Sequence, residues 1–171
     1  LRHPSKLKKL RDDLYDDDDK LVYAPAIDTS NVTSAESMYE GCVALKQIPY
    51  YDLSKCTDVT YMFKDCKDLE MIDLSKWDIG NMKNMNYAFY YCSALRDLTI
   101  PYGVTTINSY AFRYCSALDI VILPSSVSSI GTYAFANCSS LSKVNIDNTI
   151  VSVPFLFASN AVTNISRAVS T

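Results

Sequence analysis

The sequence has a single histidine and lacks the closely paired cysteines that structural zinc sites commonly use. The histidine is His3, and no two of the six cysteines are separated by two residues. A catalytic site requires a base, a nucleophile or a metal held in a cleft, and histidine most often serves as the base. We therefore predict that this chain has no catalytic residue, no metal and no cofactor, and that it is not an enzyme.

An excess of basic residues and a long apolar run are also missing. The 171 residues contain 16 Lys and Arg against 19 Asp and Glu, which gives a formal net charge of -3. A nucleic-acid partner would need a basic stripe, so none is expected. No stretch approaches the roughly 18 consecutive apolar residues of a transmembrane helix, so no membrane span is predicted. Because the sequence begins at Leu1 without a signal-type segment, we interpret it as a mature or trimmed fragment.

The main positive feature is a repeated phrase. Residues 110–118 read Tyr-Ala-Phe-Arg-Tyr-Cys-Ser-Ala-Leu, and residues 133–141 read Tyr-Ala-Phe-Ala-Asn-Cys-Ser-Ser-Leu. The shared skeleton, Phe-x-x-Cys-x-x-Leu, also fits two earlier segments, and a third has Tyr39 in the Phe position. We predict that the skeleton forms the core of a repeat fold. Its members are Phe63, Cys66, Leu69, Phe89, Cys92, Leu95, Phe112, Cys115, Leu118, Phe135, Cys138 and Leu141.

Five of the six cysteines occupy one position of the repeat, at intervals of 24, 26, 23 and 23 residues. Stacked copies would place them in a column of buried thiols, since cysteine without a disulfide is among the most buried residue types. Cys56 aligns with Val32 and Met82 and is also interpreted as a core residue. A disulfide between neighbouring copies stays open, because the spacing of stacked copies suits its geometry. A zinc site is the least favoured alternative.

The copies come in two forms. Those from Ile27 to Leu98 share Asp-x-x-x followed by an apolar residue, whereas those from Thr99 onward contain an apolar residue followed by Pro. Apolar residues that alternate after each repeat Leu predict one short strand per copy, and helical turns carrying Ala-Phe-x-x-Cys. The copy around Trp77 is two residues longer, which predicts a bulge or a widened turn.

Residues 1–20 are predicted to be a charged N-terminal capping segment with a degenerate first repeat, and residues 21–171 the repeats proper, with a degenerate C-terminal repeat. The acidic run from Asp16 to Asp19 is interpreted as a solvated end. A calcium site and a residual protease-tag sequence are the alternatives for this run.

A repeat of 23–26 residues with one strand per copy predicts an α/β leucine-rich-repeat solenoid, with a short parallel sheet and turns or short helices on the opposite face. Residues 28–45 and 100–118 resemble the two subtypes of BspA-like leucine-rich repeats, and the resemblance extends from residue 15 to about residue 160. It implies a bacterial protein, secreted or on the cell surface, that serves in recognition or adhesion. It also implies an extracellular or host protein as partner and no catalysis by the repeats.

The outward positions of the predicted strands form the candidate binding surface, because they stack into columns on the sheet. Mixed charge around exposed Ile120 and Ile122 is typical of a modest protein-recognition patch. These positions could equally be ordinary outward strand residues, and a structural spacer, or stalk, with no ligand of its own is the alternative function. The candidate residues are Lys46, Gln47, Glu70, Asp73, Arg96, Asp97, Thr99, Ile120, Ile122, Lys143 and Asn145.

Thirteen tyrosines form a second pattern. One set lies two residues before each repeat Phe and is predicted to pack between copies, with hydroxyl groups reaching water. A second set, Tyr90, Tyr91 and Tyr114, belongs either to an interface or to ordinary surface. The first set comprises Tyr61, Tyr87, Tyr110 and Tyr133.

Overall fold

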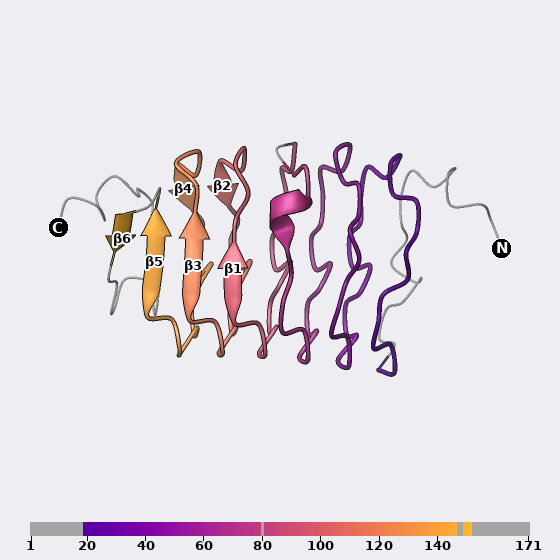
Figure 1. The fold of residues 1–171 in the computed structure, drawn as a ribbon, viewed down its shortest axis with the longest axis horizontal. Coiled ribbons are helices and arrows are strands. Elements are labelled where there is room, and N and C mark those ends of the chain that lie inside the picture. Colours follow the sequence, from indigo (N-terminus) through magenta and orange to yellow (C-terminus); the bar gives the residue numbers. More distant parts are fainter. Residues whose placement is uncertain (1–18, 80, 147–148, 152–171) are drawn as a thin grey trace.

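The structure is a computed structural model that describes residues 19–79, 81–146 and 149–151. Successive copies of the repeat lie side by side in the order of the sequence (Figure 1). Each copy runs up through an extended segment on one side and returns through turns, so that equivalent residues of neighbouring copies meet. The chain therefore has the repeat fold with short parallel sheets that its periodicity predicts.

The larger sheet has four short strands in the order β1-β3-β5-β6. They are β1 (Asp97–Thr99), β3 (Ile120–Leu123), β5 (Lys143–Ile146) and β6 (Thr149–Val151). The first three pair in parallel, and β6 is antiparallel to β5. Leu98, Val121 and Val144 are in register and buried, because alternate side chains of a strand point to the same face.

A second parallel pair, β2 (Thr106–Ile107) and β4 (Ser129–Ile130), lies beyond the upper ends of β1 and β3 (Figure 1). In the described copies before β1, the sheet side has no strand and only two isolated parallel bridges, Tyr23 with Gln47 and Met71 with Asp97. The prediction of one strand per copy is therefore wrong for these copies. Pro49 supplies no N–H to a ladder, and in the next copy the chain enters a 3-10 helix directly after Asp73.

The Ala-Phe-x-x-Cys segment forms turns, and the prediction of helical turns there was wrong. In each described copy, two residues four positions apart have a positive φ, for example Tyr87 at 58° and Tyr91 at 62°. A right-handed helix needs negative φ throughout, so these residues interrupt it. The N–H groups of Phe89 and Tyr91 instead bond to carbonyl groups of the next copy, at 2.8 and 2.9 Å. The turns thus hold neighbouring copies together.

The aromatic residue of the repeat forms a continuous column through the core. Tyr39, Phe63, Phe89, Phe112 and Phe135 follow one another with ring centroids 5.7, 5.2, 5.1 and 5.3 Å apart. All five side chains are buried, and the planes of successive rings are inclined by 27° or less. Offset stacking of this kind adds to the stabilisation from burial of the rings.

The cysteines lie beside this column. All six are thiols, and all are buried except Cys138, which is half-buried against the core. Four of the thiol groups donate to backbone carbonyl groups of the preceding copy, for example Cys92 to Phe63 at 3.1 Å and Cys115 to Phe89 at 3.2 Å. These bonds connect adjacent copies inside the core, a role that spacing alone did not reveal.

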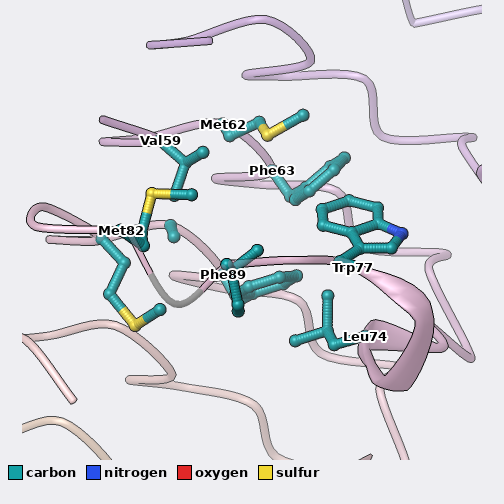
Figure 2. A pocket seen from close by; sticks show the side chains of 10 residues that line it. Val59, Met62, Phe63, Leu74, Trp77, Met82 and Phe89 are labelled. Atoms are coloured by element: carbon teal, nitrogen blue, oxygen red, sulfur yellow. The ribbon is translucent and has the colours of Figure 1, made fainter. Parts of the chain in front are cut away.

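The longer copy uses its extra residues in the 3-10 helix η2 (Leu74–Lys76), whose N-cap is Asp73. Trp77 follows and packs into the core against Phe63. Figure 2 shows that Trp77, Phe63 and Phe89 surround a small cavity together with Met62 and Met82. The cavity measures about 20 Å³ and has apolar walls, so it could hold at most one water and offers that water no hydrogen bond.

Two expectations concern residues outside the described ranges. Residues 1–18 contain most of the predicted capping segment and all of the acidic run except Asp19. Residues 152–171 contain most of the predicted degenerate C-terminal repeat. The proposed boundary between the cap and the repeats therefore stays a prediction.

Candidate recognition surface

The outward side chains of the extended segments lie on one face, here called the sheet face. All eleven predicted binding residues are on it, and all are exposed except Ile120 and Asn145, which are half-buried. Pairing brings them together in two rows that cross the copies. The rows are Met71, Asp97, Ile120 and Lys143, and Thr99, Ile122 and Asn145.

Charges of opposite sign alternate along the edge where the extended segments begin. Lys46, Glu70, Arg96 and Asp119 occupy equivalent positions in successive copies. Asp119 accepts a hydrogen bond from the hydroxyl group of Ser142. Within the described ranges, no salt bridge joins any two of these four charged groups. The charged ends of Lys46, Glu70 and Arg96 are accordingly available to a partner.

Apolar side chains are interspersed with these charges. Met71 is 71% exposed and Ile122 is 40% exposed. Tyr23, 65% exposed, extends the row of Met71 toward the N-terminus, because Tyr23 forms a parallel bridge with Gln47. Neither Tyr23 nor Met71 was among the predicted binding residues. The interval of 24 residues between Tyr23 and Gln47 was the signal that could have placed Tyr23 on this face.

A groove lies on the sheet face between two neighbouring copies. Its larger part, about 340 Å³, is lined by residues 46–48 and 70–73. A continuation of about 170 Å³ shares Ile48, Ile72 and Asp73 with it and extends to Tyr50 and Trp77. Lys46, Gln47, Glu70 and Asp73 of the predicted surface therefore meet in one depression. The contribution of Ile48, Ile72, Tyr50 and Trp77 was missed, because period-two alternation assigned isoleucine to the interior.

One polar atom on this face has no partner. The side-chain oxygen Oδ1 of Asn145 is shielded from solvent and forms no hydrogen bond with a described residue. Asn145 pairs with Ile122 on one side and with Ile150 on the other, next to residues 147–148, which lie outside the description.

The tyrosines form a second surface on the turns. Tyr61, Tyr87, Tyr110 and Tyr133 pack ring against ring across four copies, with centroids 5.2, 4.7 and 5.5 Å apart. Burial, followed by the neighbouring Tyr110 and Tyr61, raises the pKa of Tyr87. Every ring in this row is covered by a neighbouring ring on at least one side. Packing between copies therefore explains much of the repeated occurrence of tyrosine at this position.

Tyr90, Tyr91 and Tyr114 form a cluster next to this row. The rings of Tyr91 and Tyr114 stack at 4.3 Å, and Tyr90 stands edge-on to both. Arg113 lies over the rings of Tyr110, Tyr114 and Tyr133 and donates a hydrogen bond to the Tyr114 hydroxyl group at 3.1 Å. The position that a cationic ligand would take among these rings is thus filled by Arg113.

The cysteines are poorly suited to nucleophilic chemistry. Burial raises the pKa of Cys66, Cys92 and Cys115 well above the usual thiol value, and it raises that of Cys138 to about 12. A reactive cysteine needs the opposite shift, because the thiolate is the nucleophile. In the described part of the chain, no three His, Cys, Asp or Glu side chains are grouped so that they could hold a metal ion.

Stacked copies of 23–26 residues with parallel backbone pairing, and a core of one aromatic residue, one Cys and one Leu from each copy, define a leucine-rich-repeat class of protein. Residues 83–167 match the family described as BspA type leucine rich repeat region. Residues 17–121 match the family described as Mycoplasma protein of unknown function, DUF285. The chain belongs to the DUF285 family, whose model matches more than half of it, and residues 83–167 are BspA-type leucine rich repeats, so the expectation from its motifs is confirmed.

No curated protein matches the chain. Among solved structures, a leucine rich cell surface protein from Faecalibacterium prausnitzii A2-165 is similar, with 23% sequence identity and a TM-score of 0.47. The match covers 69% of this chain and 37% of that protein, so the chain spans well under half of its length. Among the described residues, no helix is both long enough and apolar enough to cross a membrane.

Proposed function

We propose that this chain is a non-catalytic recognition or adhesion module that is secreted or held at a bacterial cell surface, and that its sheet face binds an extracellular or host protein. The observation that carries the proposal is the open sheet face, on which exposed Met71 and Ile122 lie among charges such as that of Arg96, which has no salt bridge to any residue that the structure describes. Protein-binding patches combine exposed apolar groups with a polar surround in this way.

The proposed recognition module is a solenoid that consists of two parts. We propose residues 1–20 as a charged capping segment with a degenerate first repeat, and residues 21–171 as the repeat solenoid with a degenerate C-terminal repeat. Terminal repeats need a polar outer face, because an open end would expose the apolar core. The charged composition of residues 1–20 suits that role.

Binding to a panel of purified plasma and extracellular-matrix proteins, with and without replacement of four sheet-face residues, tests the proposal. The variant carries Arg96→Ala, Ile120→Ser, Ile122→Ser and Lys143→Ala, and we expect it to lose at least about ten-fold in affinity, since interface energy is concentrated in few residues. A control with Lys83→Ala and Tyr102→Ser, both exposed and outside the sheet rows, should bind normally. Unchanged binding by the four-residue variant would remove the sheet face from recognition.

A structural spacer is the second candidate. The aromatic column from Tyr39 to Phe135 and the inter-copy bonds of the cysteines give the repeats the continuous core that a stalk needs. A spacer requires no ligand, so wild-type chain that bound nothing in the panel would favour this function.

A further inference from the structure

The row of backbone contacts along the sheet face is interrupted at one place in the described part of the chain. Tyr23 forms a parallel bridge with Gln47, and Met71 forms one with Asp97. Asp97 in turn pairs with Ile120, where β1 meets β3. Gln47 and Met71 occupy equivalent positions in adjacent copies, yet no bridge joins them. Elsewhere these same two copies remain in contact, since the N–H of Asp68 bonds to the carbonyl of Val43 at 3.1 Å. The copies therefore separate locally on the sheet face.

Backbone groups at the interruption lack the partners that a continuous ladder would supply. The N–H and C=O groups of Ile48 and of Met71 form no hydrogen bond with any residue in the described ranges. In a regular parallel ladder such groups pair with the neighbouring strand. Two stretches of backbone, one on each side of the groove, can thus accept a further chain.

The groove between these stretches is elongated along the strand direction. Residues 46–50 line one wall, which at the rise of an extended chain corresponds to a length of about 15 Å. Ile48 and Ile72 lie in both parts of the groove, and Trp77 lies at the far end. Its volume of about 340 Å³, with a continuation of about 170 Å³, is within the range of ligand sites.

We propose that this groove binds an extended peptide segment of a partner protein, with apolar side chains on Ile48 and Ile72 and a Lys or Arg side chain toward the carboxylates. Main-chain groups of the peptide pair with those of Ile48 and Met71, as in recognition by added strands. Glu70 and Asp73 outnumber Lys46, so the lining is net negative and favours a basic peptide. This inference rests on the proposed function and specifies where on the sheet face, and by what kind of segment, recognition takes place.

The interruption itself can be tested in the unliganded chain. Hydrogen exchange of the Ile48 and Met71 amides should be fast, because neither N–H is hydrogen-bonded, whereas the Val121 amide in the paired strand β3 should exchange slowly. Slow exchange of both Ile48 and Met71 would mean that the two copies are joined by a closed ladder, and it would overturn the inference.

The ligand class is tested by selection on the whole chain from a display library of random peptides of about nine residues, of which about five fill the groove when extended. We expect recovered peptides to alternate apolar with other residues and to contain Lys or Arg. Binding should change the fluorescence of Trp77, the single tryptophan, and should slow exchange of the Ile48 and Met71 amides. Failure to recover any peptide that slows these amides would overturn the proposal.

Two variants separate the groove from the rest of the sheet face. Met71→Arg adds a positive charge at the groove on a side chain that is 71% exposed, so the fold should tolerate it, and it should weaken peptide binding at least about ten-fold. Tyr102→Arg places the same charge at an exposed position outside the groove and should have little effect. Equal binding by Met71→Arg and wild type would exclude the groove. If the four-residue sheet-face variant still lost its protein partner, the proposed function would stand and only the groove would be rejected.

Discussion

The thiol group of Cys92 donates a hydrogen bond to the backbone carbonyl of Phe63, 3.1 Å away, and so connects two copies of the repeat through the interior. Cys66, Cys115 and Cys138 make the same contact with the preceding copy. The cysteine is therefore more than a small apolar residue. It gives the Phe63 carbonyl a second donor beside the N–H of Cys66, and this second bond comes from the neighbouring copy.

Replacing Cys92 with Ala should lower the free energy of unfolding by about 1–3 kcal/mol, because the sulfur leaves a void and the Phe63 carbonyl loses one of its two donors. Urea unfolding followed by circular dichroism measures the change. Cys138→Ala is the matched control, since Cys138 makes the same bond but is only half-buried. Equal losses at both positions would show that depth of burial is unimportant here.

Stability should fall at alkaline pH. Burial raises the folded-state pKa of Cys92 and Cys115 above the value of 9.0 expected for an exposed thiol, and that of Cys138 to about 12. Below pH 9 the thiols are neutral in both states. Above it they ionise in the unfolded chain first, so the unfolded state gains stability until the pH passes the folded-state values.

The measurement is the urea midpoint at about pH 8 and about pH 10.5. The Cys92→Ala variant has one buried thiol fewer, so its midpoint should decrease less over this interval than that of the wild type. An identical decrease in both proteins would assign the alkaline effect to other groups, such as Tyr87 and Tyr90, whose pKa values burial also raises.

The positive φ angle at Asn137 predicts that glycine is more favourable than alanine at this position. This residue has φ of 61° and an exposed side chain. Asn137→Ala should lower the free energy of unfolding by about 1 kcal/mol, whereas Asn137→Gly should have little effect or stabilise, because glycine adopts this conformation without strain. Thermal unfolding of both variants provides the test. At Thr132, which is exposed with negative φ, the order should be reversed and Ala should be the better residue.

Thr29 provides a stabilising substitution. Its side chain is buried, and its hydroxyl oxygen has no hydrogen-bond partner among the described residues. The equivalent residues of the next two copies, Leu53 and Ile79, are buried and apolar. Thr29→Val keeps the shape and removes the unsatisfied group, so the free energy of unfolding should increase by about 1–2 kcal/mol. A decrease on chemical denaturation would show that the hydroxyl group is satisfied in solution.

Periodicity in the chain was sufficient to predict the repeat fold and the parallel pairing, and the resemblance of its motifs to known repeats indicated the family. A residue that recurs at one position of every copy, such as Phe112 or Cys115, must meet its equivalents when the copies stack, whatever the details of the backbone. The outward rows on the sheet face followed from the same reasoning, because alternation along a strand fixes which side chains share a face.

Local conformation and defects in the stack depended on tertiary contacts. Tyr87 and Tyr91 have left-handed backbone because the N–H groups around them bond to the next copy, which no local propensity of tyrosine predicts. The interruption between Gln47 and Met71, and the groove that it opens, likewise arise where two adjacent copies fail to pair. Repetition in a sequence specifies what neighbouring copies share, whereas only their packing in three dimensions determines where they come apart.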